Sequence, residues 1–251
     1  MENSENISEL AVLILAAGKG TRMKSNMPKV LHSLGGKPLL AYSLELAQEL
    51  DSRRTIVVVG HQAQRVKQAF SQYSGLRYVL QEPQLGTGHA VMAAAPQLED
   101  WQGPVLILCG DVPGLKAATC RKLLSRHLSH GEALTVLAMD LPDPGAYGRL
   151  VLDEKDQLTR IVEFRDADPA QRAISLVNAG IYAGQAQAML EFLPRLATDN
   201  DQQEYYLTDL VEMMHWAGLK VGYAVCPDPL EVAGVNSKEE LAELESRLLP
   251  T

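Results

Sequence analysis

Two kinds of segment alternate along the first half of this chain. Short apolar runs, each bounded by glycine, proline or polar residues, predict buried strands at Ala11–Ala16, Thr55–Val59, Leu76–Leu80, Val105–Cys109 and Leu134–Ala138. Apolar residues spaced three and four apart predict helices between them at Leu39–Leu50, Gln62–Tyr73, His89–Ala95 and Lys116–Leu128. Such alternation is typical of βαβ units, so we expect an α/β fold: a Rossmann-like three-layer sandwich with a mostly parallel sheet.

The pattern changes after about Asp140. Strand-like pieces are joined by turn-rich segments and lie at Arg149–Leu152, Leu158–Phe164 and Val177–Ala183, which predicts a small β-rich lobe. Near the end, Ser237 is followed three residues later by Glu240, a capping box that opens an amphipathic helix. We therefore expect a single domain over residues 1–251, divided into 1–140, a lobe and lid at 141–236, and a C-terminal helix at 237–251.

Composition excludes several classes of protein. The formal net charge of −8 argues against a general electrostatic grip on nucleic acid, which needs a basic surface. The chain has no apolar run of membrane-spanning length and no leader-like start, so we expect neither a membrane partner nor secretion. Its three cysteines are odd in number and far apart, which indicates a reducing compartment. The expected location is the cytoplasm.

Positive charge is nevertheless concentrated near the beginning of the chain. No acidic residue occurs between Glu9 and Glu45, and the cations in that interval are Lys19, Arg22, Lys24, Lys29 and Lys37. A solvated face is the simplest explanation of such a run. The alternative is a local site for an anion.

A glycine loop inside this run favours the anion site. The first strand leads directly into Gly18-Lys19-Gly20, where backbone amides can approach a ligand closely and form an anion-binding nest. The loop lacks the Walker A spacing, and it has Met23 where a dinucleotide fingerprint needs a third glycine. From this turn alone, an ordinary strand-to-helix connection remains an equal alternative.

The residues around the loop resemble a known family. The segment Leu15–Met23, with Pro28-Lys29 after it, is similar to the L-x-A-G-x-G-x-R-M and P-K signature of the sugar-nucleotide pyrophosphorylase superfamily. Further similar segments lie at Gln81–Ala90, Gly110-Asp111, Tyr147–Arg149, Val162-Glu163, Val177–Gly180, Glu204–Asp209 and Glu231–Asn236. They follow the order of the N-acetylglucosamine-1-phosphate uridyltransferase subfamily and extend over nearly the whole chain.

This resemblance implies an activity and a set of site residues. The implied reaction is magnesium-dependent transfer of a uridylyl group from UTP to N-acetylglucosamine 1-phosphate, with release of pyrophosphate, for peptidoglycan precursor synthesis. Residues 1–140 would bind the nucleotide and 141–236 the sugar. The implied catalytic residues are Arg22, Lys29 and Asp111. The implied substrate-binding residues are Leu15, Ala16, Ala17, Gly18, Lys19, Lys29, Gln81, Gly86, Thr87, Cys109, Gly110, Gly148, Glu163, Asn178 and Asn236.

Two residues are the implied magnesium ligands. Asp111 ends a predicted parallel strand at the edge where ligands of such folds collect, although a turn-forming aspartate is an alternative. Asn236 could instead cap the last helix, but Ser237 can already supply that cap. One carboxylate and one amide oxygen suit magnesium, which keeps several waters and substrate phosphates as ligands.

The implied base and sugar contacts also have simpler alternatives. Gln81 carries both a donor and an acceptor, which match the edge of uracil, and Gly86 would allow close backbone approach. A solvated glutamine would need no such role. Glu163 and Asn178 would contact the sugar together with Gly148 and Thr87, or would be ordinary surface residues of a hairpin.

Two rival functions remain open at this point. The first is a sister enzyme with another sugar or pyrimidine, since Cys109, Arg165 and Ala179 depart from residues common in the subfamily. The second is a non-catalytic nucleotide-sugar sensor, which would be expected to lack a phosphate-binding cation or a metal ligand. The hexapeptide-repeat domain that drives trimerisation in these enzymes is not part of this sequence, so we expect a monomer.

Overall fold

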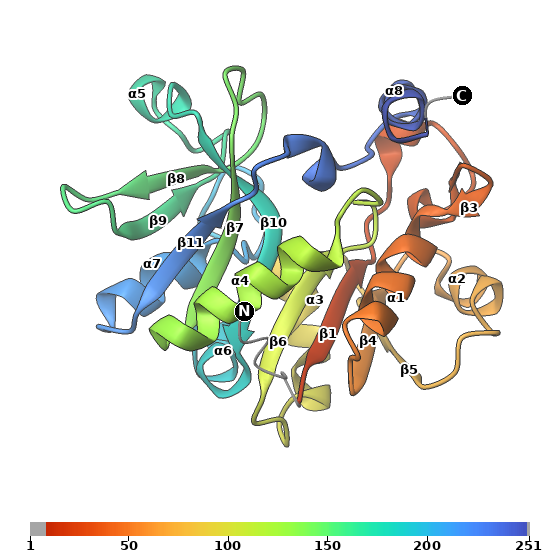
Figure 1. Cartoon of the computed structure of the whole chain (residues 1–251), viewed down its shortest axis with the longest axis horizontal. Helices are drawn as coiled ribbons and strands as arrows, with labels where there is room; N and C mark the ends of the chain where they lie inside the picture. Colours follow the sequence, from red (N-terminus) through yellow and green to blue (C-terminus); the bar gives the residue numbers. More distant parts are fainter. Residues whose placement is uncertain (1–8, 250–251) are drawn as a thin grey trace, which may run out of the picture.

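The computed structural model describes residues 9–249 and is built around one large sheet. Its main strands follow the order β11-β7-β10-β6-β1-β4-β5 (Figure 1). Their bounds are β1 Ala11–Ala16, β4 Arg54–Val59, β5 Leu76–Leu80, β6 Pro104–Cys109, β7 Leu134–Asp140, β10 Leu176–Gln185 and β11 Val221–Val225. A hairpin of β8 (Arg149–Leu152) and β9 (Leu158–Val162) joins this sheet through β10.

Strand direction is mostly parallel. Strand β1 pairs in parallel with β4 and β6, β4 with β5, and β7 with β11. Strand β10 is antiparallel to both β6 and β7. The inner strands are apolar on both faces and almost fully buried, as a sheet covered on two sides requires.

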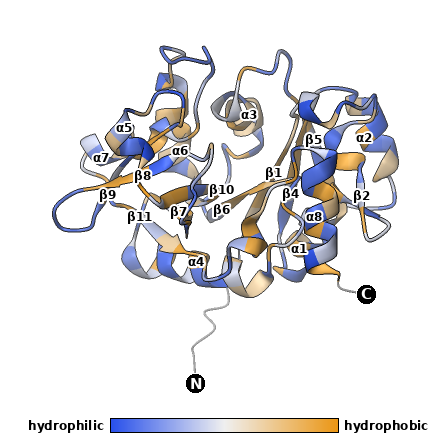
Figure 2. Ribbon diagram, turned by 90° about the horizontal axis from the view of Figure 1, so that it is seen from above, coloured by the Kyte–Doolittle hydropathy of each residue, from blue (hydrophilic) through white to orange (hydrophobic). Residues whose placement is uncertain are grey.

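Helices cover both faces of the sheet (Figures 1 and 2). One face carries α1 (Leu39–Glu49), α2 (Ala63–Ala69) and α4 (Ala117–His130), which share an apolar cluster with Val12 and Ile14 of β1. The other carries α3 (Thr87–Ala94), α6 (Ala186–Phe192) and α7 (Asp209–Trp216), which pack with Leu13. The expected three-layer α/β fold is confirmed.

Short elements complete the chain. They are η1 Thr21–Met23, η2 Lys29–Leu31, β2 Ser33–Leu34, β3 Lys37–Pro38, η3 Ala95–Gln97, α5 Pro169–Arg172, η4 Leu193–Arg195, η5 Pro229–Val232 and α8 Lys238–Leu248. Within residues 9–249, no helix combines the length and the apolar character that crossing a membrane would require.

The second half of the chain differs in part from its expectation. Arg149–Leu152 and Leu158–Val162 do form a hairpin, but the piece expected at Val177–Ala183 is most of β10, which lies in the main sheet between β6 and β7. Its apolar residues are buried on both faces, and a register shift between Asn178 and Ile181 bends the strand. The second half therefore supplies two main-sheet strands, β10 and β11, besides the hairpin.

Helix α8 packs onto the glycine-loop end of the molecule. Its Leu244 shares a small apolar cluster with Met23 and Val235. Ser237 caps the helix by accepting a hydrogen bond from the backbone N of Glu240 at 3.1 Å. The expected capping box is only half formed, because the Glu240 carboxylate accepts from the backbone N of Asn236, at 2.8 Å, and not from Ser237.

The buried centre of the sheet should dominate stability. Leu13 is fully buried in β1, so Leu13→Ala should lower the free energy of unfolding by about 2–5 kcal/mol through lost burial and a cavity. Leu80→Ala is the matched control, because Leu80 is 49% exposed at the edge strand β5 and should change stability by no more than about 0.5 kcal/mol. Urea unfolding followed by circular dichroism measures both, and equal losses would contradict this description of the core.

Candidate active site

The loop after β1 lies at the carboxyl edge of the parallel strands. The chain leaves β1 at Ala16 and enters η1 at Thr21. Gly20 has a φ of +60°, and a Cβ built on it would lie 2.7 Å from the Cβ of Lys29. Only glycine lets the loop lie against η2 in this way. Lys19 and Arg22 are exposed on the loop, where a bound anion could reach them.

The end of β6 lies beside this loop. The backbone N of Gly110 donates to the carbonyl of Leu15 at 3.0 Å, which continues the β1–β6 pairing beyond the strand. Asp111 therefore leaves the sheet next to the glycine loop. Leu15 is half-buried and Ala16 and Ala17 are buried, so these residues would meet a ligand mainly through their backbones.

Asn236 reaches the same place from the far end of the sequence. The backbone N of Val235 donates to the carbonyl of Asp111 at 3.0 Å. Val235 is fully buried against the η1 and α8 side of the molecule. This contact places the side chain of residue 236 beside that of residue 111.

The ammonium group of Lys29 lies between the two predicted metal ligands. It forms an ion pair with Oδ2 of Asp111 and donates to Oδ1 of Asn236 at 3.2 Å. One cation touches both oxygens, so the carboxylate and the amide oxygen face a common point. This pair of hard oxygen donors fits magnesium, which needs few protein ligands. Among residues 9–249, no group of three or more His, Cys, Asp or Glu side chains suggests another metal site.

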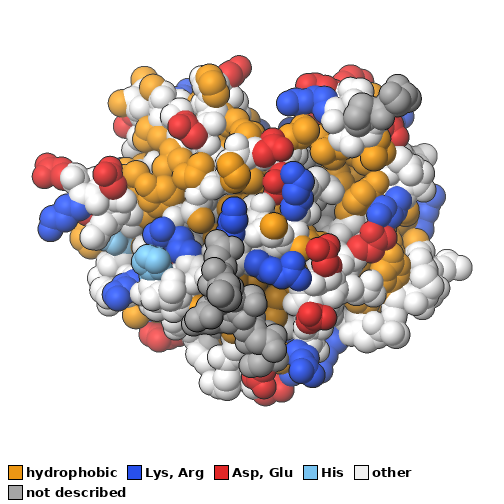
Figure 3. Space-filling model, in the orientation of Figure 1, with side chains coloured by type: hydrophobic (Ala, Val, Ile, Leu, Met, Phe, Trp, Pro, Cys, Tyr) orange, Lys and Arg blue, Asp and Glu red, His pale blue; other side chains and the backbone are white. Residues whose placement is uncertain are grey.

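The surface around this edge is concave. Figure 3 shows it hollowed between α8 and the part of the molecule that carries α5. The carboxyl ends of β1 and β6 point toward this hollow in Figure 1. The structure thus brings Lys29, Asp111 and Asn236 together beside the loop that holds Lys19 and Arg22.

Gln81 is buried rather than solvated. Only 3% of the residue is exposed, and its Nε2 donates to the carbonyl of Gly86 at 2.9 Å. The same nitrogen lies 3.2 Å from Nδ1 of His89, which accepts the second proton when the imidazole is protonated on Nε2. Both amide protons are then used inside the protein. The acceptor Oε1 remains for a base, and the donor half of the expected match with uracil must come from another group.

Gly86 and Thr87 lie where the loop that follows β5 packs against the segment before α7. Gly88 donates to the carbonyl of Tyr205 at 2.8 Å, and the backbone N of Leu207 donates to Oγ1 of Thr87 at 3.2 Å. A Cβ on Gly86 would lie 2.7 Å from the Tyr205 carbonyl oxygen. Gly86 therefore permits close packing of two protein segments, and the Thr87 hydroxyl holds the second segment in place.

The three residues expected around the sugar also come together. The backbone N of Asn178 donates to the carbonyl of Gly148 at 2.8 Å, and a Cβ on Gly148 would lie 3.3 Å from Oε2 of Glu163. Burial raises the pKa of the Glu163 carboxyl, while Oε1 accepts a hydrogen bond from the Thr208 hydroxyl at 3.1 Å. A half-buried carboxylate next to a glycine suits recognition of hydroxyl groups.

Asn178 is held more tightly than a simple surface residue would be. Its Nδ2 donates to the Tyr182 hydroxyl at 2.7 Å, and its Oδ1 accepts from the backbone N of Gly180 at 2.8 Å. The Cys109 thiol donates to the carbonyl of Gly180 at 3.3 Å. Cys109 therefore links the end of β6 to β10, the strand that carries Asn178.

Thr208 is the residue at this site that sequence reasoning missed. It lies in the segment Glu204–Asp209, which formed part of the family resemblance, but no chemistry was assigned to that segment. Its hydroxyl touches Glu163, and its neighbour Leu207 touches Thr87. Its hydroxyl side chain, in a segment similar to the family, was the one feature of the sequence that could have pointed to a role at the site.

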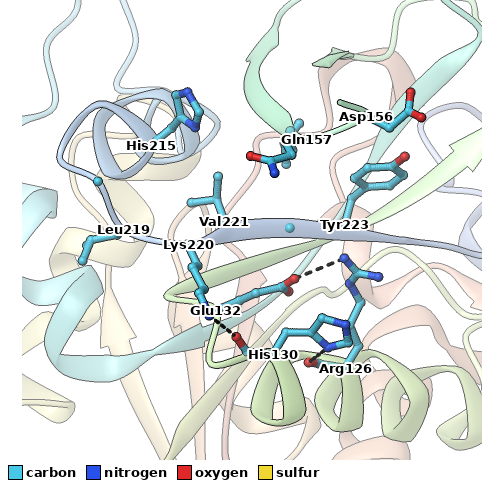
Figure 4. Close-up of a pocket in the computed structure, with 13 residues that line it drawn as sticks. Arg126, His130, Glu132, Asp156, Gln157, His215, Leu219, Lys220, Val221 and Tyr223 are labelled. Carbon is cyan, nitrogen blue, oxygen red and sulfur yellow. Dashed lines mark hydrogen bonds and ion pairs between the residues drawn. The ribbon is translucent and has the colours of Figure 1, made fainter. Parts of the chain in front are cut away.

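A second cavity lies away from this site. It has a volume of about 490 Å³ and lies between the end of α4, the β8–β9 turn and β11 (Figure 4). Arg126, Lys220, Glu132 and Asp156 line it, so its formal charges balance. None of the residues expected to bind substrate belongs to it.

Gly86 provides a test of the contact between the two segments. Its φ of +101° and ψ of 176° fall in a region open essentially to glycine alone, so Gly86→Ala should lower the free energy of unfolding by about 1–3 kcal/mol, and more if Tyr205 cannot move. Gly75→Ala is the control, because Gly75 also has a positive φ but has no atom within 4 Å of a Cβ. Urea midpoints that fall equally in both variants would show that packing against Tyr205 contributes nothing.

Asp209, the first residue of α7, should make stability depend on pH. Burial, with help from the charges of Glu212 and Glu163, raises its pKa from 3.8 to about 6. A raised carboxyl pKa means that ionisation opposes folding, so this penalty is absent below pH 4 and complete above pH 6. Asp209→Asn should therefore gain stability relative to the native protein as pH rises from 4 to 6.5, by about 1 kcal/mol for this half-buried group.

Urea unfolding at several pH values measures this difference. Asp156→Asn, in the exposed β8–β9 turn, serves as the control and should follow the native protein across the range. If the free energy of unfolding of Asp209→Asn changes with pH in the same way as that of the native protein from pH 4 to 6.5, the raised pKa is contradicted.

The chain is similar over most of its length to known proteins. The family model of the MobA-like NTP transferase domain matches residues 12–191. The chain is 48% identical over 239 residues to bifunctional protein GlmU of Synechococcus sp. (strain RCC307), covering 95% of this chain and 52% of that protein. It is 46% identical over 237 residues to bifunctional protein GlmU of Geobacter metallireducens, covering 94% and 50%. It thus spans about half the length of these curated relatives.

A solved structure shows the same fold. It is a putative glucose-1-phosphate thymidylyltransferase from Bacillus anthracis, with a TM-score of 0.77, 16% sequence identity and coverage of 96% of both chains. At that identity the likeness concerns the fold alone. The family match over most of the chain and the two GlmU relatives carry the assignment: this chain belongs to the family of MobA-like NTP transferase domains.

Proposed function

We propose that this chain transfers a uridylyl group from UTP to N-acetylglucosamine 1-phosphate, forming UDP-N-acetylglucosamine and pyrophosphate. The observation that carries the proposal is the meeting of Lys29, Asp111 and Asn236 beside the glycine loop. A cation, a carboxylate and an amide oxygen at one point can neutralise a triphosphate with the help of a divalent metal. Similarity to the first half of GlmU supports the choice of substrates.

The chemistry needs alignment and charge neutralisation more than proton transfer. A sugar 1-phosphate has a second pKa near about 6, so its attacking oxygen already carries charge at neutral pH. The oxygen attacks the α-phosphorus of UTP in line, the bond to the β-phosphate bridge oxygen breaks, and pyrophosphate leaves. Arg22 and Lys29 would stabilise the negative charge that develops on the phosphates, and the amides of Gly18 and Lys19 would hold them in place.

Asp111 and Asn236 would hold magnesium, which supplies charge neutralisation at the phosphate oxygens. Metal binding would displace the Lys29 ammonium from these two oxygens and leave it free to contact the neighbouring phosphates. Lys29 begins η2, Asp111 follows the end of β6 and Asn236 precedes α8, and the neighbours Val30, Val112 and Val235 are buried. The reacting groups would therefore meet in a site whose geometry the sheet edge sets.

Base and sugar would bind on either side of this charged centre. Oε1 of Gln81 would accept the N3–H of uracil, since Nε2 donates to the Gly86 carbonyl and faces His89. Gly148, Glu163 and Asn178 would surround the hydroxyl and acetamido groups of the sugar. We accordingly assign nucleotide binding to residues 1–140 and sugar binding to residues 141–236 of one domain, closed by α8.

One alternative substrate is favoured by a specific observation. Oε1 of Gln81 can accept the N3–H of thymine as well as that of uracil, so a thymidylyltransferase would use the same contact. A nucleotide-sugar sensor without chemistry is the other alternative, and it would bind both substrates without turnover. The proposed product fits a location in the cytoplasm, where UDP-N-acetylglucosamine would serve cell-wall precursor synthesis. We further propose that the chain acts as a monomer.

A pyrophosphate-release assay separates these functions. UTP, dTTP, CTP, ATP and GTP are each combined with N-acetylglucosamine 1-phosphate, glucose 1-phosphate or mannose 1-phosphate, with and without magnesium. The proposal expects the fastest release with UTP and the N-acetyl sugar, and only when magnesium is present. Faster release with dTTP would favour the sister enzyme, and binding without release would favour the sensor.

Asp111→Ala should lower kcat at least about 100-fold, because it removes charge stabilisation from the transition state. The Asp111 side chain is only 18% exposed and pairs with Lys29, so the variant should also lose some stability, and circular dichroism checks that turnover is measured on folded protein. Asp156→Ala, on the far side of the molecule, is the control and should keep native turnover. Near-native kcat for Asp111→Ala would reject the metal assignment.

A further inference from the structure

Glu231 is a buried carboxylate close to the candidate metal site but outside it. Its side chain is 7% exposed, and its two oxygens contact two different residues at the beginning of α4. Oε2 accepts from the Thr119 hydroxyl at 2.5 Å, and Oε1 accepts from the Lys116 ammonium at 3.0 Å. Burying a carboxylate is unfavourable unless hydrogen bonds and an opposite charge satisfy it, so these three side chains hold each other in one geometry.

The segment that carries Glu231 lies directly on the loop after β6. A Cβ on Gly114 would lie 2.9 Å from the carbonyl oxygen of Leu230 and 3.3 Å from Cα of Glu231. Further along, the backbone N of Val235 donates to the carbonyl of Asp111. The loop at 111–116 therefore contacts the segment at 230–235 in two places, at Gly114 and at Asp111. Asn236 is the next residue after this segment.

We propose that Glu231 is a positioning residue that fixes the distance between Asn236 and Asp111 by tying the segment 230–236 to the beginning of α4. Its oxygens are both engaged by α4, so it acts through the position of Asn236 and not by touching substrate. This inference rests on the proposed function, since it concerns how the metal ligands of that site are held. Partners outside the ligand set are known to change metal affinity about 10- to 100-fold when they are removed.

The other end of α4 offers a matched control. Glu132 is also a buried carboxylate, with its side chain 5% exposed. It accepts from the Thr135 hydroxyl at 2.6 Å. It also pairs with Arg126 at 3.2 Å (Figure 4). Glu132 and Glu231 thus have the same kinds of partner and similar burial, but Glu132 lines the cavity away from the candidate active site.

The test compares Glu231→Gln with Glu132→Gln. Mn²⁺ binding to each variant in the presence of UTP is measured by calorimetry, and turnover is measured as a function of Mn²⁺ concentration. Glu231→Gln should weaken Mn²⁺ binding at least about 10-fold and raise the half-saturating Mn²⁺ for turnover in parallel, with kcat largely recovered at saturating metal. Glu132→Gln should leave both within about twofold of native, while its urea midpoint falls about as far as that of Glu231→Gln.

Native Mn²⁺ affinity in a folded Glu231→Gln protein would overturn the inference, as would equal weakening in Glu132→Gln. If Glu231→Gln does not fold, Thr119→Val replaces it, because it removes one hydrogen bond and keeps the Lys116 pair. That variant should weaken Mn²⁺ binding several-fold, and native affinity would again overturn the inference.

The same measurements separate this inference from the proposed function. A native protein that binds Mn²⁺ and UTP but releases no pyrophosphate would reject the function, and the calorimetric comparison would still decide the role of Glu231. A native protein that binds no Mn²⁺ with UTP would overturn both.

Discussion

The parallel pairing of β1 with β6 is the constraint on which the candidate site depends. The two strands are far apart in the sequence, yet their register runs from Ala11 with Val105 to Leu15 with Cys109. One more hydrogen bond, from Gly110 to Leu15, extends the pairing past the strand end. The glycine loop and Asp111 therefore leave the sheet side by side, and every other group at the site is arranged around them.

Much of this arrangement could be predicted from the sequence. Strand β1 begins and ends where its apolar run does, because a buried strand needs an uninterrupted run of apolar residues. Strand β5 also has its expected bounds, although it is a partly exposed edge strand that includes Arg77. The meeting of Lys29, Asp111 and Asn236 was expected from the family resemblance and from the rule that ligands collect at the carboxyl ends of parallel strands. Local pattern and resemblance together were enough for the charged centre.

The position of β10 and the contacts of Gln81 and Glu231 depend on long-range packing that the local sequence pattern does not encode. The run at Val177–Ala183 has the composition of any buried strand, and only its long-range partners decide that β10 enters the sheet antiparallel between β6 and β7. The side-chain nitrogen of Gln81 contacts Gly86 and His89 inside the protein, which spacing alone could not show. For the same reason the sequence does not distinguish Glu231 from other acidic residues, because its contacts with Lys116 and Thr119 appear only in the folded chain.

Two hydrogen bonds on neighbouring residues connect the loop after β5 to Glu163, which follows β9. Thr87 holds the backbone of Leu207, and the next residue, Thr208, holds Glu163. A substitution that moves Glu163 would therefore also disturb the loop that includes Gln81 and Gly86. Under the proposed function, changing the preferred sugar without changing the preferred nucleotide would require compensating substitutions at Thr87 or Thr208, so the two specificities of this chain would change together.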